Sequence, residues 1–215
     1  PIPEIPENPI LKEFMDLEET QNYLSDNYHL PFGYNQENAT VYALDLRRIF
    51  CYLIQGKARS GKTNVVRVLA SMSKKKGGNT ALIDFSGSLH KFAEKNEIDY
   101  LASEHEIAEY WRGILPDIQK RNAIHKELRI QEADDNEIYE RMCQEKAYYI
   151  FIDNLAEFVQ KIYNPSDPAD EMSRFLENIT DKGRLYQIFF FVCIDNEKLA
   201  EISGYRIFEN MARCK

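Results

Sequence analysis

Residues 56–63 read GKARSGKT and match the phosphate-binding pattern G-x-x-x-x-G-K-[ST] at every fixed position. Typical residue frequencies produce such a match by chance in about one chain in a hundred. The pattern belongs between a strand and a helix. Here the apolar run IFCYLIQ, residues 49–55, precedes the loop, and apolar residues recur at helical spacing through residues 65–72. The flanks therefore predict a buried strand, a glycine loop and a helix, which restricts the chain to an α/β fold.

Each fixed residue of this P-loop has a physical task. Gly56 and Gly61 let the backbone turn and approach phosphate closely, so that successive N–H groups face the anion at the positive end of the following helix. Lys62 is predicted to bridge the β- and γ-phosphates of ATP or GTP, and the Thr63 hydroxyl to bind Mg²⁺. The predicted nucleotide-binding residues are Gly56, Lys57, Ala58, Arg59, Ser60, Gly61, Lys62, Thr63 and Asn64. The alternative is a vestigial turn that keeps the pattern without binding nucleotide.

A site of this kind also needs an acidic residue at the carboxyl end of a neighbouring buried strand, where it holds Mg²⁺ mostly through water. Asp153 ends the apolar run YYIFI and is predicted to be that residue. Thr63 and Asp153 then form the expected metal site, and Lys62 and Asp153 the expected catalytic residues. Asp84, after TALI, is the competing acid and is interpreted as structural.

Hydrolysis requires a group that orients the attacking water, and many P-loop enzymes place a glutamate directly after the acidic residue. Here that position is Asn154, whose amide can hold a water but cannot accept its proton. Weak or absent ATP hydrolysis by the domain alone is therefore expected. Glu157 is either a substitute base or a solvated surface acid, and the second reading is favoured.

The rest of the chain alternates between strand and helix patterns. Apolar runs predict further strands near residues 42–46, 80–85, 98–101, 147–153 and 186–194. Helical patterns are found at residues 11–24, 104–146, 169–180 and from residue 196. The long helical segment is expected to break near Pro116 and again at residues 134–136. This order predicts a three-layer α/β fold with a mainly parallel sheet.

Composition limits the partners and the setting. The formal net charge is −8 and the acidic residues are scattered, which disfavours DNA because non-specific DNA affinity comes largely from basic side chains. The longest apolar runs fall well short of the roughly 20 residues that cross a bilayer. The four cysteines form no C-x-x-C pair, as is typical of a reduced cytosolic setting.

The start of the chain, PIPEIPENP, is proline-rich and acidic, unlike a secretory leader. Residues 1–28 are predicted to be a linker and an N-terminal helix, and residues 29–215 the P-loop domain. The missing initiator Met favours an excised fragment of a larger protein.

Three further features leave alternatives open. The four histidines show no metal-ligand spacing and are interpreted as surface or packing residues. The lysines at 74–76 either contact nucleic acid or, as favoured, close the helix before Gly77. Arg184, before the last predicted strand, is either an arginine finger toward a neighbouring subunit or, as favoured, a surface arginine.

The order of these segments resembles the FtsK/SpoIIIE group of ring-forming motor ATPases. The resemblance covers nearly the whole chain after about residue 28 and rests on LPFGYNQENATVYALDL, IFCYLIQGKARSGKT, YYIFIDN and DKGRLYQIFFFV. Within the group, the acidic balance and the segment PIPEIPENP are most similar to a C-terminal ATPase module of the EssC/EccC motors of type VII secretion.

The resemblance implies a RecA-like module that binds ATP with Mg²⁺, one of a string of such domains behind the transmembrane segments of a parent protein. It implies neighbouring ATPase modules and small WXG-type helical secretion substrates as partners. It also implies a cytoplasmic location at the inner face of the cell membrane, reached through the parent protein.

The chain departs from that family at three places. The P-loop carries KARS at residues 57–60 where the family has more glycine, and Asn154 replaces the usual catalytic acid. Residues 193–196 read CIDN where DNA-pumping relatives carry Thr-Gln-Arg-Pro. These differences argue against fast turnover and DNA translocation. The first hypothesis is an ATP-binding module of a secretion motor, and the alternatives are a DNA translocase motor and a structural interaction module without nucleotide.

Overall fold

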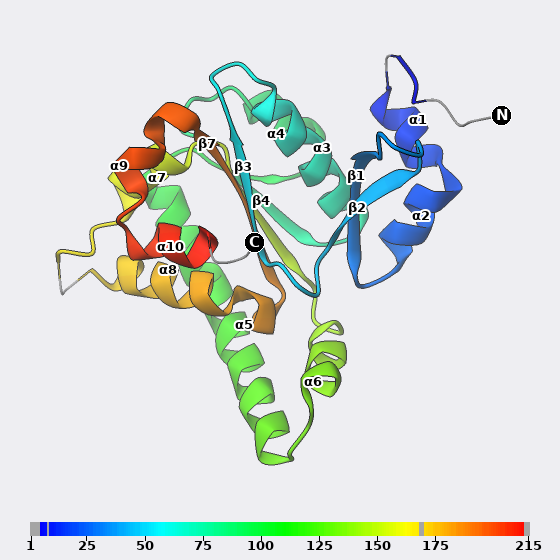
Figure 1. Cartoon of the computed structure of the whole chain (residues 1–215). Helices are drawn as coiled ribbons and strands as arrows, with labels where there is room; N and C mark the ends of the chain where they lie inside the picture. The colour runs from blue at the N-terminus through cyan, green and yellow to red at the C-terminus, as the bar shows by residue number, and fades with distance from the viewer. Residues whose placement is uncertain (1–4, 8, 168–169, 213–215) are drawn as a thin grey trace.

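The central element of the computed structural model is a parallel sheet. The structure describes residues 5–7, 9–167 and 170–212, and within them five strands pair in the order β3-β7-β6-β4-β5 (Figure 1). The strands are β3 (Cys51–Gly56), β4 (Asn79–Ile83), β5 (Asp99–Leu101), β6 (Tyr148–Ile152) and β7 (Ile188–Asp195). Every pairing between them is parallel. Their carboxyl ends therefore meet at one edge of the sheet, where β3 leads into the P-loop.

Helices cover both faces of this sheet, which confirms the predicted three-layer α/β fold. They are α3 (Lys62–Lys75), α4 (His90–Lys95), α5 (Glu104–Ile130), α6 (Asp135–Met142), α7 (Leu155–Ile162), α8 (Glu171–Lys182), α9 (Leu199–Ile202) and α10 (Arg206–Ala212), with short 3-10 turns η1 (Gly183–Tyr186) and η2 (Asn196–Lys198). In Figure 1, α3 lies on the side of the sheet toward the N-terminal hairpin, and α5, α7, α8 and α10 lie on the other side. The core thus lies in two layers, one on each side of the strands.

Aromatic side chains fill both layers. On one face Phe191 stacks on Phe151 with ring centroids 4.7 Å apart, and on the other Phe190 lies 6.3 Å from Trp111 of α5. Strands β6 and β7 are buried on both faces, as expected for central parallel strands, because successive side chains point to opposite sides. This rigid centre fixes the positions of the loops at the carboxyl edge.

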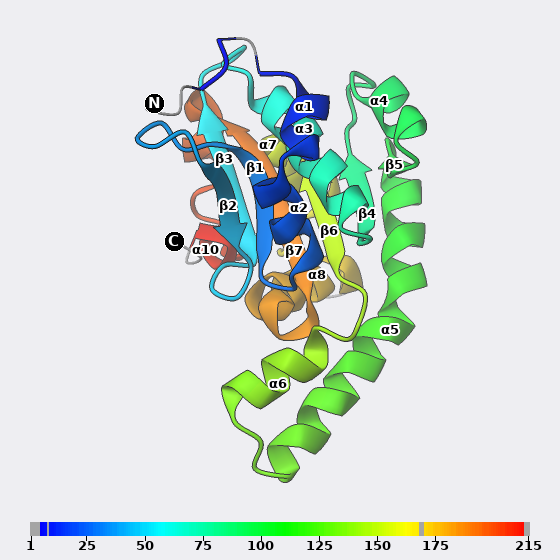
Figure 2. The ribbon, with the colours of Figure 1, turned by 90° about the vertical axis from the view of Figure 1, so that its right-hand side faces the viewer.

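The N-terminal part packs on the same body. Its elements are α1 (Leu11–Asp16), α2 (Glu18–Ser25), β1 (His29–Tyr34) and β2 (Val41–Asp45), seen in front of the sheet in Figure 2. The single helix predicted over residues 11–24 is two helices, because Leu17 adopts an extended backbone conformation. The strand predicted near residues 42–46 is β2, which pairs with β1 in an antiparallel hairpin. The boundary predicted at residue 28 stays a prediction, although buried Phe14 contacts Tyr34 across it, and residues 1–4 and 8 of the predicted linker lie outside the described residues.

The expected break near Pro116 is wrong, because α5 runs unbroken through it. Proline removes one helical hydrogen bond, but Trp111, Ile114 and Ile118 bury the helix on both sides of it. Arg121 fixes the next turn by donating to Asp117 at 2.7 Å and to the carbonyl oxygens of residues 146 and 186. The second break is observed, and α6 begins after it with an Asp134 capping box.

Helices α4 and α7 lie outside the sequence predictions. Helix α7, directly after β6, was not predicted, because eight residues following a strand give too few turns for a clear helical period. None of the helices described combines the length and the apolarity needed to cross a bilayer.

Candidate functional site

The P-loop forms a hollow between β3 and α3. Its backbone turns through left-handed conformations at Arg59 (φ 61°) and Gly61 (φ 92°). A Cβ added to Gly56 would lie 2.5 Å from the Ser60 hydroxyl oxygen, so any other residue here would force the Ser60 side chain to turn away. The hollow measures about 230 Å³ and is lined by Arg59, Ser60, Gly61, Lys62, Thr63 and Asn64. The other three predicted nucleotide-binding residues, Gly56, Lys57 and Ala58, form the first part of the loop and do not line the hollow.

The start of α3 points into this hollow. Gly61 is the N-cap residue, and no side chain in the described part of the chain caps the helix. The first N–H groups of a helix have no partner within it and carry a partial positive charge. The hollow is therefore shaped and charged for an anion such as a phosphate group.

Lys62 and Asp195 form an ion pair beside the hollow. The Lys62 ammonium lies 2.6 Å from the Asp195 carboxylate and donates to the Lys57 carbonyl oxygen at 2.8 Å. Asp195 is the last residue of β7 and pairs with Gly56 in the sheet register. Sequence reasoning read this segment as CIDN without placing Asp195 in the site. The sequence predicts a strand that ends near Asp195 but not that this strand lies next to the P-loop strand, which is what brings Asp195 to the site.

Asp153 follows β6, the strand next to β7, at the same edge of the sheet. Its carboxylate accepts a hydrogen bond from the Thr63 hydroxyl at 3.2 Å. Burial raises the pKa of the Asp153 carboxyl, Asp84 raises it further, and Thr63, Lys62 and Arg67 oppose the shift. A divalent cation would offset both unfavourable effects. The hydroxyl of Thr63 and the carboxylate of Asp153 are the hard oxygen ligands that suit Mg²⁺.

Asp84 is held differently, although it also ends a strand at this edge. It is 2% exposed and accepts hydrogen bonds from the Ser86 hydroxyl at 2.6 Å and the Leu89 N–H at 2.8 Å. Tyr100 donates a further bond at 3.1 Å. Burial would raise the pKa of Asp84, but these hydrogen bonds outweigh it and hold the pKa below its usual value. Its carboxylate thus organises the loop after β4, and the structure brings Thr63 to Asp153 and not to Asp84.

Asn154 and Glu157 are engaged with each other at the start of α7. The Asn154 side chain accepts from the Glu157 N–H at 3.1 Å, and its amide donates to the Glu157 carboxylate at 3.4 Å. Glu157 also pairs with Lys161 at 3.1 Å. Both side chains therefore serve the helix start in this conformation, and their roles toward water stay predictions.

Arg184 lies at the amino end of β7, at the sheet edge opposite the P-loop. Its guanidinium donates to the Arg47 carbonyl oxygen at 3.3 Å. An action on a neighbouring subunit stays a prediction. As for the histidines, no group of three or more His, Cys, Asp or Glu residues in the described ranges is arranged to hold a metal ion.

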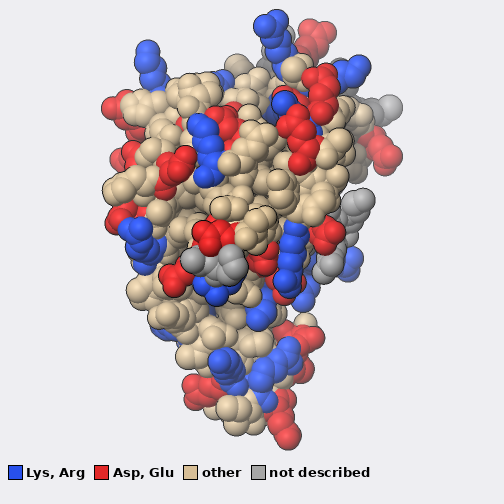
Figure 3. All heavy atoms as spheres, turned by 90° about the vertical axis from the view of Figure 1, so that its left-hand side faces the viewer, with Lys and Arg blue, Asp and Glu red and all other residues tan. Residues whose placement is uncertain are grey.

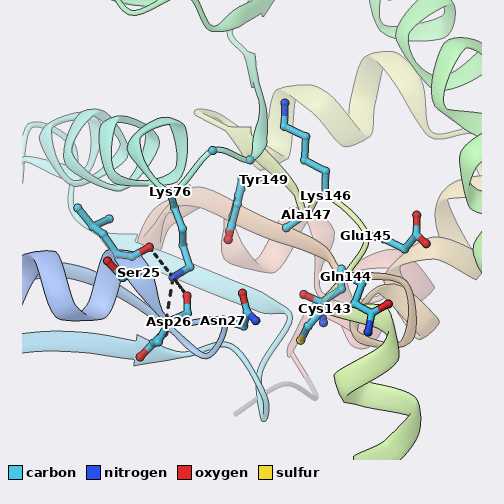
Figure 4. A pocket seen from close by; sticks show the side chains of 14 residues that line it. Ser25, Asp26, Asn27, Lys76, Cys143, Gln144, Glu145, Lys146, Ala147 and Tyr149 are labelled. Atoms are coloured by element: carbon cyan, nitrogen blue, oxygen red, sulfur yellow. Dashed lines mark hydrogen bonds and ion pairs between the residues drawn. The ribbon is translucent and has the colours of Figure 1, made fainter.

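Lys76 also lies at this opposite edge. It lines a polar cavity of about 260 Å³ shown in Figure 4. Its ammonium donates to the Tyr23 carbonyl oxygen at 2.9 Å and pairs with Asp26 at 3.6 Å. Lys76 thereby joins the ends of α2 and α3, in line with the helix-closing role that the sequence favoured.

Comparisons with known proteins give solved structures only. No protein-family model and no curated protein matches the chain. The cytoplasmic domain of EssC matches with a TM-score of 0.78 and 17% identity, over 100% of this chain and 39% of that chain. EccC of Thermomonospora curvata (ATPases 2 and 3), in complex with a signal sequence peptide, matches with a TM-score of 0.65 and 16% identity, over 87% of this chain and 32% of that chain.

A third solved structure is the pCW3 conjugation coupling protein TcpA, with a TM-score of 0.62 and 18% identity, over 88% of this chain and 54% of that chain. The chain therefore spans between about a third and about half of these solved chains. TM-scores of 0.62 to 0.78 at 16 to 18% identity show a shared fold and nothing more. The chain has the fold of an FtsK/SpoIIIE-type P-loop ATPase domain, as found in EssC and EccC.

Proposed function

We propose that this chain is an ATP-binding module of a type VII protein-secretion motor of the EssC/EccC kind. The observation that carries the proposal is the P-loop hollow itself, which is lined by Lys62 and by Thr63, whose hydroxyl donates to Asp153. This arrangement belongs to a chain with the fold of EssC. The geometry of the P-loop and the fold thus support the same assignment.

Different groups of the site are proposed to bind the phosphates and the metal ion. The N–H groups at the start of α3 receive the phosphates, and the Lys62 ammonium neutralises the β- and γ-phosphate charge. Mg²⁺, held by Thr63 and by Asp153 through water, would neutralise the remaining phosphate charge. Bound nucleotide then stabilises one conformation of the module.

Hydrolysis by the domain alone is proposed to be weak or absent. The position after Asp153 carries the amide of Asn154, and the Glu157 carboxylate is paired with Lys161. An amide cannot take a proton from water, and the Glu157 carboxylate is engaged with Lys161 and the Asn154 amide in this conformation. A neighbouring module of the same chain or ring is the proposed source of any missing catalytic group.

Recognition of an exported substrate is the second part of the proposal. The EccC structure holds a signal sequence peptide. A groove of about 320 Å³ between α5 and α8 offers an apolar surface for such a segment, lined by Ala108, Trp111, Leu115, Met172 and Phe175 with charged Arg112 and Glu171. The occupant proposed is the C-terminal segment of a small WXG-type helical substrate. The cytoplasmic location at the membrane belongs to the same proposal and depends on the parent protein.

A test of the groove uses a synthetic peptide with the C-terminal signal of a WXG-type substrate. Leu115→Asp places a charge in the groove and is expected to lower the peptide affinity about tenfold. Ile130→Asp is the matched control, because Ile130 is exposed at the end of α5 outside the groove. Equal affinities of both variants, measured by fluorescence anisotropy, would place the peptide elsewhere.

A DNA translocase is the less supported alternative. The net charge is −8, and on the face shown in Figure 3 basic and acidic side chains are interspersed. Salt-dependent DNA affinity requires a concentration of basic groups along the path of the phosphates. A salt-sensitive gel shift together with DNA-stimulated phosphate release would favour this alternative.

Calorimetric titration of Mg·ATP and Mg·ADP into the purified domain, with steady-state phosphate release on the same sample, tests the binding proposal. We expect saturable binding, little phosphate release and a rise in melting temperature on adding Mg·ATP. Lys62→Ala is expected to remove that rise. A melting temperature that Mg·ATP leaves unchanged would instead favour a structural interaction module.

A further inference from the structure

Asp195 forms an ion pair with the Lys62 ammonium group, which is the group proposed to bind the nucleotide phosphates. The Lys62 Nζ atom lies 2.6 Å from the Asp195 Oδ1 atom, and its second bond goes to the Lys57 carbonyl oxygen. An ammonium group has three N–H donors, so two are engaged with the protein itself. Both acceptors lie next to the P-loop strand, because Lys57 follows Gly56 in the chain and Asp195 pairs with Gly56 in the sheet.

The geometry of this pair is built into the sheet. β7 lies between β3 and β6, and its last residue is aligned with Gly56 at the start of the loop. The Lys62 side chain is 13% exposed and that of Asp195 39% exposed, so the pair is partly withdrawn from water. Partial burial makes the attraction stronger than in a fully solvated pair.

The pair and a nucleotide make competing demands. A phosphate held at the start of α3 draws the Lys62 ammonium toward the hollow and away from the carboxylate. If Lys62 turns, Asp195 loses its cation and faces the phosphate charge at short range. If Lys62 stays, the phosphates lose the lysine. In both cases the carboxylate opposes binding.

We propose that Asp195 is a tethered competitor for nucleotide phosphate, which keeps Lys62 engaged in the nucleotide-free domain and sets the affinity of the P-loop. The inference rests on the proposed function, since it concerns the same site. It adds a regulatory residue that discriminates between nucleotides. ATP brings one more phosphate than ADP to Lys62, so Asp195 opposes ATP more strongly than ADP.

The test is a titration of Mg·ATP and Mg·ADP into the wild-type domain and three variants. Asp195→Asn keeps the shape of the side chain and removes its charge, and Asp195→Ser removes the charge with a smaller group. Glu197→Gln is the matched control, because it removes one negative charge two residues along the chain, in η2, without touching Lys62.

We expect both Asp195 variants to bind Mg·ATP about tenfold more tightly than wild type, with a smaller gain for Mg·ADP. Glu197→Gln is expected to stay within about twofold. Without nucleotide, Asp195→Asn is expected to melt at or slightly below the wild-type temperature, because it loses the ion pair.

Two outcomes separate this inference from the function on which it rests. If wild type and the Asp195 variants bind Mg·ATP equally, the competition is wrong and the nucleotide site stands. If neither wild type nor any Asp195 variant binds nucleotide, both the inference and the proposed function fail.

Discussion

Asn154 caps helix α7 by accepting a hydrogen bond from the N–H of Glu157 at 3.1 Å. The same residue stands directly after Asp153, where many P-loop enzymes carry the glutamate that activates water. The Asn154 side chain therefore caps α7 and also takes the position after Asp153 where a catalytic base would stand. The two roles can be separated by substitution.

Asn154→Ala is expected to lower the free energy of unfolding by about 1 kcal/mol, because it removes the N-cap. Asn154→Asp keeps a capping oxygen but replaces the amide that donates to Glu157 with a second carboxylate, so its stability is expected to fall between those of wild type and Asn154→Ala. Urea unfolding measures both. Asn154→Asp also supplies a carboxylate, so steady-state phosphate release is expected to rise above the wild-type rate. A wild-type urea midpoint for Asn154→Ala would show that the cap contributes nothing.

Asp153→Asn is expected to stabilise the nucleotide-free domain at neutral pH. Burial and Asp84 raise the pKa of the Asp153 carboxyl in the folded state. A raised carboxyl pKa means that the folded state binds its proton more tightly, so the residue's contribution to stability falls as pH rises from about 4 to the folded pKa and stays low above it. The amide carries no charge and escapes this cost. Thermal melts from pH 4 to 8 are expected to show a variant that gains most over wild type near pH 7.

The same variant is expected to lose the Mg²⁺-dependent part of ATP binding, which melts with ATP plus either Mg²⁺ or EDTA would reveal. Asp84→Asn is the control with the opposite sign. The pKa of Asp84 is lowered, so its contribution is present above about pH 4 and is lost as pH falls through the folded pKa. Asp84→Asn is therefore expected to destabilise the domain at pH 7. Stabilisation by both substitutions would contradict the distinction between the two carboxylates.

Much of the fold was predictable because its signals are local. The strand before the P-loop, the loop and the first turn of α3 are consecutive in sequence, and buried parallel strands give continuous apolar runs. Features that depend on distant contacts were missed. Pro116 looked like a helix end, since its neighbours in sequence do not show that Trp111 and Ile118 anchor the helix in the core.

The site likewise combines residues that a local sequence pattern predicts with a residue that only the folded sheet brings in. Lys62 and Thr63 belong to one short pattern, whereas Asp195 enters the site only because β7 lies beside β3 in the sheet. Strand order depends on packing across the whole chain, and the sequence pattern alone does not fix it. Asp153 could be proposed since it ends a strongly apolar strand, but its contact with Thr63 required the structure.

Arg121→Met is expected to be strongly destabilising. The buried guanidinium donates to Asp117 and to two backbone carbonyl oxygens and stacks 4.9 Å from the centre of the Tyr148 ring. Methionine fills similar space but removes the donor to the two carbonyl oxygens and the cation beside Asp117, which keeps its hydrogen bond from the Tyr148 hydroxyl, at a cost of about 3 kcal/mol. Arg112→Met is the control, because Arg112 is exposed and pairs only at the surface with Glu109, so its loss is expected to cost less than about 1 kcal/mol. Comparable urea midpoints for the two variants would show that Arg121 is not a structural anchor.

Two glycine-to-alanine substitutions are expected to act in opposite directions. A Cβ on Gly78, just before β4, would lie 2.2 Å from the buried Tyr149 ring, and the ring is packed among the aromatic side chains of the sheet. Gly78→Ala therefore forces a shift in the core and is expected to cost about 1 to 3 kcal/mol.

Gly113 lies inside α5 with nothing within 4 Å of an added Cβ. Gly113→Ala is expected to stabilise the domain by about 0.5 to 1 kcal/mol, since alanine restricts the unfolded chain and favours the helix. Thermal and urea unfolding of both variants check the pair, and a stabilised Gly78→Ala would mean that Tyr149 has room to move and that the sheet at this edge is less tightly packed than its contacts indicate.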